Sequence, residues 1–272
     1  MSTQAIANGI DDGSIPFLEL TDEFDFNCHQ CGTCCHDIDV LLNPWDVIKL
    51  HRELKIPTQE IMNYIHIQPG GRSKWPMVLL NMVEPRIKIP GRTRSACSFL
   101  KGGKCSVYKE RPTVCRSYPI GRVSGRNQET NEALPERYIL VPEQCAAYNA
   151  GVKHTVSDWI KEADLEDRWA KSREYDKVLM DLLGIKKIDM KELLADQLAY
   201  SILVNLLFNV DDQERSYVSI IGEEPTDEEL YSFMLATSSV WASGLWKDTR
   251  DMAEAGDPDE TSNTLNSQVV SQ

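Results

Sequence analysis

Apolar and polar positions follow different patterns in the two halves of the chain. Before Val156 the apolar residues form short runs broken by Pro, Gly and Cys, which is typical of short strands, turns and irregular segments. From Val156 onward they recur at about every third or fourth position, which predicts helices. The pattern predicts an α+β fold, in which an irregular N-terminal half with β-hairpins and short helices packs against a helical C-terminal half.

Two helices are predicted early in the chain. Asn43 is a favourable N-cap and a proline follows it, which predicts a helix over Pro44–Leu54. Pro57 begins a second predicted helix, whose apolar positions continue to Ile65 and which ends before Pro69.

The clearest hairpin runs from Ala96 to Tyr108 around a Gly-Gly turn. A two-residue turn would pair Leu100 with Cys105 and put Cys97 on the opposite face. A three-residue loop with a glycine bulge would instead pair Phe99 with Cys105 and bring Cys97 to the same face. If both cysteines bind one metal, the bulged form is expected.

Other elements of the N-terminal half are short. Residues 75–90 alternate weakly and predict a strand pair. Pro112 begins a short helix that Pro119 stops, and Tyr138–Val141 is expected to be a strand that leads to Cys145.

The C-terminal half predicts at least three helical stretches. One extends from Val156 to Leu182, and a strongly apolar one covers Lys191–Asn209. Another begins at Thr226, where Glu229 three residues later completes a capping box.

Cysteine is the residue type that carries the chemistry. Thiolates are soft ligands that favour iron–sulfur clusters, zinc and copper(I). Four of the eight cysteines fall within eight residues, so they are expected either to bind metal or to pair as disulfides. The eight are Cys28, Cys31, Cys34, Cys35, Cys97, Cys105, Cys115 and Cys145.

Length and composition favour metal over disulfides. A chain of 272 residues can bury a core without disulfide staples. No secretory signal is visible in the polar stretch Met1–Glu23, and no run of 18 apolar residues predicts a membrane span. We therefore expect a cytoplasmic protein whose clustered thiols are reduced and bind metal.

The charge is strongly negative overall but basic in one segment. The net charge is −13, yet Arg86–Arg126 holds eleven Lys or Arg and a single acid, Glu110. Such a chain lacks the broad basic face of a nucleic-acid-binding protein. We expect Arg111 and Arg116 to offset the charge of a metal–thiolate centre as cofactor-binding residues; the alternative is a solvated hairpin and loop.

The spacing of the first cysteines distinguishes between metals. Cys28, Cys31 and Cys34 form two overlapping Cys-x-x-Cys pairs, as in the ferredoxin loop that binds a 4Fe-4S cluster. Cys35 departs from that pattern, because adjacent side chains diverge and rarely bind one ion. The later cysteines are too widely spaced for a second zinc knuckle. An iron–sulfur cluster is therefore favoured, with zinc second and mononuclear or dinuclear iron third.

Several motifs together resemble one known family. The runs Phe26-x-Cys28-x-x-Cys31-Gly32-x-Cys34-Cys35, Cys97-x-Phe99-Leu100 and Arg111-Pro112-x-x-Cys115-Arg116 are similar to those of the YkgJ-like CxxCxxCC family, over about residues 24–145. The resemblance implies a zinc- or iron-chelating domain. Flagellin lysine N-methylases have a similar cysteine cluster, but no glycine-rich strand–loop–helix for S-adenosylmethionine is evident here.

These observations predict a division of the chain and three candidate functions. We expect disordered tails at residues 1–23 and 249–272, a cysteine-cluster metal-binding domain at 24–150 and a helical region at 151–248 packed on it. All eight cysteines are the expected ligands. The favoured function is redox chemistry, sensing or metal handling at a thiolate site. The alternatives are an enzyme that modifies a protein or peptide, such as a methyltransferase, and a structural-zinc module with a protein partner.

Overall fold

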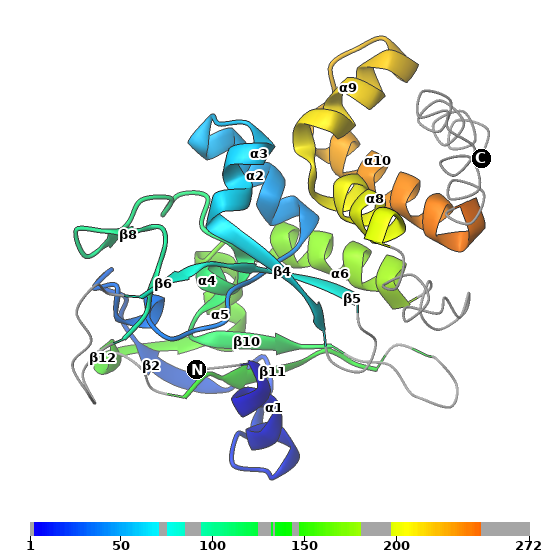
Figure 1. Ribbon diagram of the computed structural model, residues 1–272. Coiled ribbons are helices and arrows are strands. Elements are labelled where there is room, and N and C mark those ends of the chain that lie inside the picture. The colour runs from blue at the N-terminus through cyan, green and yellow to red at the C-terminus, as the bar shows by residue number, and fades with distance from the viewer. Residues whose placement is uncertain are drawn as a thin grey trace. The chain divides into compact units, whose positions relative to one another are not determined.

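The computed structural model describes residues 3–70, 75–84, 94–124, 132, 134–142, 147–180 and 197–245 (Figure 1). It is a mixed α+β structure, with small antiparallel sheets and short helices in the N-terminal part and helices in the C-terminal part, as the sequence predicted. Part of the strand pair expected in residues 75–90, part of the helix expected over Lys191–Asn209, and the predicted C-terminal tail lie outside the described residues.

Helices occur in both the N-terminal and the C-terminal part of the chain. The N-terminal helices are α1 (Thr3–Asp11), α2 (Pro44–Leu54), α3 (Thr58–Ile61) and α4 (Thr113–Ser117), with 3-10 helices η1 (Thr33–Cys35) and η2 (Met62–Tyr64). The later helices are α5 (Val156–Glu162), α6 (Glu166–Met180), α8 (Gln197–Phe208), α9 (Val210–Ile221) and α10 (Asp227–Val240), followed by the π-helix η4 (Trp241–Leu245).

The strands of the described ranges are short and form five small sheets. Their orders are β1-β11-β10, β12-β2, β3-β5-β4, β6-β7 and β8-β9. Their bounds are β1 (Phe17–Leu18), β2 (Glu23–Phe26), β3 (Leu41–Leu42), β4 (Ile65–Gly70), β5 (Trp75–Leu80), β6 (Met82–Val83), β7 (Ala96–Cys97), β8 (Leu100–Lys101), β9 (Lys104–Cys105), β10 (Ile120–Val123), β11 (Arg137–Leu140) and β12 (Tyr148–Thr155).

The chain divides into two units, each made of separate stretches. Unit 1 comprises Met1–Leu42, Tyr64–His66 and Leu79–Ala170, and unit 2 comprises Asn43–Asn63, Ile67–Val78 and Lys171–Gln272. Each unit is described by itself below.

Unit 1 has an aromatic core immediately before the cysteine run. Phe26 is 2% exposed and meets Tyr118, Tyr148 and Trp159 edge to face, with ring centroids 5.4–5.7 Å apart. Edge-to-face contacts are a favoured aromatic geometry. The same core continues into α5 and the start of α6 through Val156, Ile160, Leu165 and Trp169.

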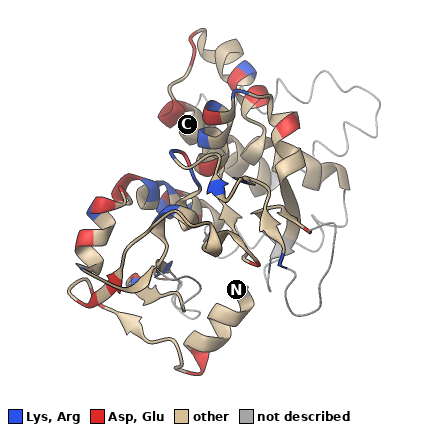
Figure 2. Ribbon diagram, turned by 90° about the vertical axis from the view of Figure 1, so that its left-hand side faces the viewer, with Lys and Arg blue, Asp and Glu red and all other residues tan. Residues whose placement is uncertain are grey.

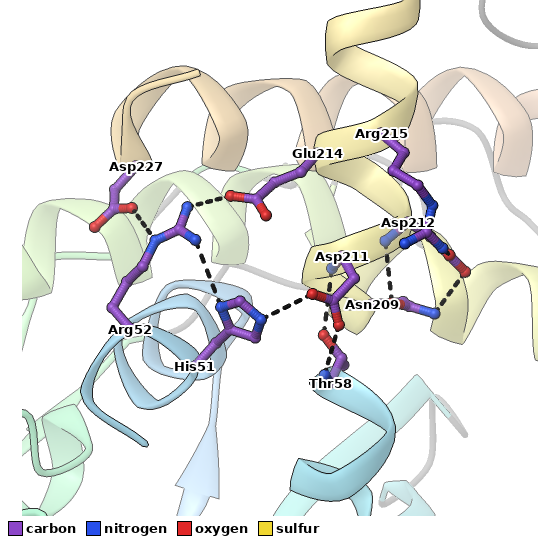
Figure 3. A network of polar contacts seen from close by, with 9 residues as sticks. All are labelled: His51, Arg52, Thr58, Asn209, Asp211, Asp212, Glu214, Arg215 and Asp227. Atoms are coloured by element: carbon purple, nitrogen blue, oxygen red, sulfur yellow. Dashed lines mark hydrogen bonds and ion pairs between the residues drawn. The ribbon is translucent and has the colours of Figure 1, made fainter. Parts of the chain in front are cut away.

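Unit 2 joins α2 to the later helices. Trp45 of α2 meets Tyr231 of α10 edge to face. At the other end of α2, His51 Nε2 lies 3.0 Å from Asp211 Oδ1, and Arg52 binds both Glu214 and Asp227 (Figure 3). These polar contacts fix α2 against the first turns of α9 and α10.

Several helix starts and one ending test the sequence predictions. Helix α2 has the predicted bounds, and Asn43 caps it in a capping box with Asp46; the capping box of Thr226 is also present. The second predicted helix is shorter than expected: α3 ends at Ile61, and Ile65 begins strand β4, because the chain there pairs into the sheet with β5. Helix α1 lies within the stretch for which no regular structure was expected.

Charged residues of both signs share the same helices (Figure 2). Helix α9, for example, carries acids in its first turn and Arg215 one turn later. Among the described residues, no helix is long and apolar enough to cross a bilayer.

Candidate metal centre

The first cysteine run folds as a loop, as its glycine predicted. Gly32 has a φ of +73°, in the left-handed region that favours glycine, and η1 follows it directly. A Cβ at Gly32 would lie 2.9 Å from the carbonyl oxygen of Gly103 and 2.8 Å from a methyl carbon of Leu100. The loop therefore packs directly on the turn of the β8–β9 hairpin, and only glycine permits this approach.

A second contact attaches the end of the loop to strand β7. His36 forms a β-bridge with Ala96, and its Nδ1 lies 3.0 Å from the carbonyl oxygen of Gly32. Asp37 accepts hydrogen bonds from the backbone N–H and hydroxyl of Ser95, and it pairs with Arg94 at 2.6 Å. Since Cys97 is two residues after Ser95, this contact brings Cys97 to the cysteine loop.

The hairpin differs from the bulged form expected for a shared metal. Leu100 pairs with Cys105, and the turn has two residues, Gly102 and Gly103, both with positive φ. This is the two-residue arrangement, so the bulged register is wrong. The prediction assumed an unbroken strand from Cys97 onward, whereas the chain turns at residues 98–99 and side-chain alternation does not carry across. Cys97 and Cys105 nevertheless interact electrostatically.

The third segment of the site is helix α4. It begins after Pro112, as predicted, and the N–H of Cys115 donates to the Pro112 carbonyl at 2.9 Å. At its C-terminal end, the indole N–H of Trp159 donates to the carbonyl of Ser117 at 2.9 Å. Helix α4 thus places Cys115 near the cysteine loop, and Cys115 interacts electrostatically with Cys35.

Five buried or half-buried thiols from these three segments interact with one another. Cys35 interacts electrostatically with Cys34, Cys97 and Cys115, and Cys34 interacts with Cys97 and Cys105. Burial is the main cause that raises the pKa of Cys97 and that of Cys105. We call this set the thiol cluster: Cys34, Cys35, Cys97, Cys105 and Cys115.

The adjacent side chains of Cys34 and Cys35 were expected to diverge, but their thiols lie together. The thiols of Cys34 and Cys35 are hydrogen-bonded to each other. This bond lowers the pKa of Cys34 to about 7 and, together with burial, raises the pKa of Cys35. Both residues belong to η1. Cys34 is therefore the thiol of this pair that ionises first.

The remaining cysteines are exposed or lie outside the described residues. Cys28 and Cys31 are exposed. A hydrogen bond with Thr33 lowers the pKa of Cys31, which also interacts electrostatically with Cys34. Cys145 lies outside the described residues. The seven described cysteines are all free thiols.

The two candidate arginines have different surroundings. Arg111 interacts electrostatically with Cys34 and Cys105, and its guanidinium stacks over the ring of Tyr108 at 4.1 Å. Arg116 instead donates to the backbone carbonyls of Lys109 and Ala163. Burial, then the charges of Arg168 and Arg111, lower the pKa of Arg116. Arg111 is thus the arginine beside the thiols, while Arg116 connects α4 to the end of α5.

The donor chemistry fits a soft metal or a cluster. Five thiols with an adjacent guanidinium can supply and stabilise the negative charge of a thiolate site. Within the described ranges, no three Cys, His, Asp or Glu side chains are arranged to hold a metal ion. The thiols are gathered without coordination geometry, so binding would have to draw them together.

Sequence reasoning did not find the contacts that assemble the site. The approach of Gly32 to Gly103, the binding of Ser95 by Asp37 and the pairing of Glu110 with Arg168 all join residues distant in sequence. The left-handed tendency of Gly32 was the only local signal among them.

Comparison with known families identifies the cysteine-containing stretch. Residues 27–146 match the family CxxCxxCC, described as "Putative zinc- or iron-chelating domain". The matched stretch contains all eight cysteines. No curated protein and no solved structure matches the chain.

Proposed function

Because residues 27–146 belong to the CxxCxxCC family, we propose that their thiols bind iron in the form of an iron–sulfur cluster. The observation that carries the proposal is the thiol cluster, in which five soft donors from three separate segments lie within electrostatic reach of one another. A structural zinc and a 4Fe-4S cluster each take four cysteine ligands, so it is the overlapping Cys-x-x-Cys pairs of the first run, as in the ferredoxin loop, that favour the cluster.

Within this proposal the cysteines have distinct parts. The thiol cluster supplies the interior ligands, and the exposed Cys28 and Cys31 close the site from the loop. Cys145 stays a predicted ligand. Arg111 stabilises the negative charge that the thiolates bring, because it lies near Cys34 and Cys105.

A bound iron–sulfur cluster would supply one-electron chemistry, which suits a redox or sensing role in the cytoplasm. Zinc is the second candidate, and the description of the family favours it equally. With zinc the site would act as a structural clip that stabilises unit 1.

Metal analysis of anaerobically purified full-length protein tests the proposal. We expect iron and acid-labile sulfide together with a visible absorption band that dithionite bleaches. A colourless protein that retains zinc after dialysis would select the structural clip. Protein that holds neither metal would contradict both. In a Cys34→Ser variant we expect lower metal content and a lower melting temperature, because metal binding and folding are coupled in such sites.

A further inference from the structure

Arg168 lies beyond the family-matched stretch and contacts the metal-binding segment. It is on α6, 7% exposed, and its Nη2 pairs with the carboxylate of Glu110 at 2.5 Å. Its Nη1 also lies 3.5 Å from the backbone carbonyl oxygen of Arg111. One buried guanidinium therefore holds two consecutive residues immediately before α4.

Arg111 lies between Arg168 and the thiol cluster in this chain of contacts. Its own guanidinium donates to the carbonyl of Tyr108 at 2.8 Å and stacks on the Tyr108 ring. In this position it interacts with Cys34 and Cys105. Arg168 thus contacts the backbone of Arg111, and the side chain of Arg111 interacts with the thiol cluster.

Positive side chains gather near the thiol cluster. Arg116 interacts electrostatically with Arg168 and Arg111 and with the acids Glu110 and Asp164, and Glu110 also pairs with Arg168. Gathering three guanidinium groups is costly unless further negative charge lies close to them. Thiolates at Cys34 and Cys105 would provide that negative charge, because both residues interact with Arg111.

We propose that Arg168 is a positioning residue of the metal centre, which holds Arg111 beside the thiol cluster so that the Arg111 guanidinium stabilises the bound metal–thiolate charge. The inference rests on the proposed function. It extends the functional unit past residue 146 into α6, which agrees with the extent of unit 1 to Ala170.

Cobalt titration of the reduced, metal-free full-length chain tests this role. The thiolate-to-cobalt absorption band reports binding, and competition with a chelator gives the affinity. We expect Arg111→Met and Arg168→Met each to lower the cobalt affinity about tenfold, the lower end of the usual effect of supporting residues. Because Arg168 acts through Arg111, the double variant should bind about as well as either single variant.

Two further variants control for folding. Arg122 forms a comparably buried ion pair with Glu136 at 2.6 Å, so Arg122→Met should lower stability but keep wild-type cobalt affinity. If Arg168→Met does not fold, Glu110→Gln breaks the same pair from its more exposed side and should give the same loss of affinity.

The outcomes separate the two proposals. Unchanged affinity in the folded Arg168→Met or Glu110→Gln variant overturns the positioning role, as do losses that multiply in the double variant. A wild-type chain that binds no cobalt would instead overturn the proposed function, and this inference with it.

Discussion

The carboxylate of Asp37 accepts hydrogen bonds from both the backbone N–H and the hydroxyl of Ser95, at 2.8 and 2.9 Å. Asp37 follows the cysteine loop by two residues, and Ser95 precedes Cys97 by two. One exposed acid thus joins the segments that carry Cys35 and Cys97, two thiols that interact electrostatically.

Removal of this carboxylate should weaken metal binding. In Asp37→Ala the strand with Cys97 loses two hydrogen bonds to the loop and the ion pair with Arg94. We expect a loss of about 1 kcal/mol in the free energy of unfolding and a lower metal affinity, measured by chelator competition. Asp12→Ala is the matched control, because Asp12 also accepts from a backbone N–H, that of Ser14, outside the cysteine segments. Equal metal affinities in the two variants would contradict the role of Asp37.

A methyl group at Gly32 should separate the loop from the hairpin. Gly32→Ala adds a Cβ 2.9 Å from the Gly103 oxygen and also strains a left-handed backbone. We expect a destabilisation of about 1–3 kcal/mol in thermal or urea unfolding and a loss of metal.

The matched variant for this test is Gly13→Ala. Gly13 has a similar φ of +76° but no atom within 4 Å of an added Cβ. The difference between the two variants therefore isolates the contact with Gly103. If both lose the same stability, the loop does not depend on that contact.

Alkylation should distinguish the thiols of the metal-free chain. The pKa of Cys34 is about 7 because of its hydrogen bond with Cys35, and the pKa of exposed Cys31 is lowered by Thr33. Thiolate is the reactive form, so the iodoacetamide reaction of Cys34 should rise steeply as the pH increases through about 7. Peptide mass spectrometry should find Cys31 and Cys34 labelled before Cys97, whose burial raises its pKa. Labelling of Cys97 first would contradict the arrangement.

Acid should weaken unit 2 through Asp211. Burial raises the pKa of this acid, but hydrogen bonds from Thr58 and His51 outweigh it, so the pKa lies below its ordinary value (Figure 3). A depressed folded-state pKa stabilises the fold above the unfolded-state pKa of about 3.9, and that stabilisation is lost as the pH falls through the folded-state value.

Urea unfolding at neutral pH and near pH 3 measures this contribution. Asp211→Asn should be less stable than wild type at neutral pH by about 1 kcal/mol, and it should lose less stability on acidification. Glu223→Gln, at an exposed acid of the same unit, should follow wild type. Identical pH dependence in wild type and Asp211→Asn would exclude the proposed contribution.

Local signals in the sequence were enough to predict some helices and strands, but not to predict how the site is assembled. The cap at Asn43 predicted the bounds of α2, because the polar side chain and the proline that follows it act within one turn. The hairpin register was wrong because a turn at residues 98–99 resets the side-chain alternation, and Ile65 became a strand residue because its partner strand lies beyond Gly70. The segments of Cys35 and Cys97 are joined by Asp37 and Ser95, a pairing that no local pattern encodes.

The interleaved layout of the two units determines how the chain can be cut. A fragment of residues 27–146 alone would contain α2 but not Tyr231, the residue of α10 that contacts Trp45 of α2. The fragment would also lack Phe26 and strand β12, which pairs with β2. Apolar faces on both units would then be exposed to water, and such surfaces promote aggregation. The boundaries of the sequence family are therefore not those of a self-sufficient folding piece, and biochemical work on this site needs the intact polypeptide.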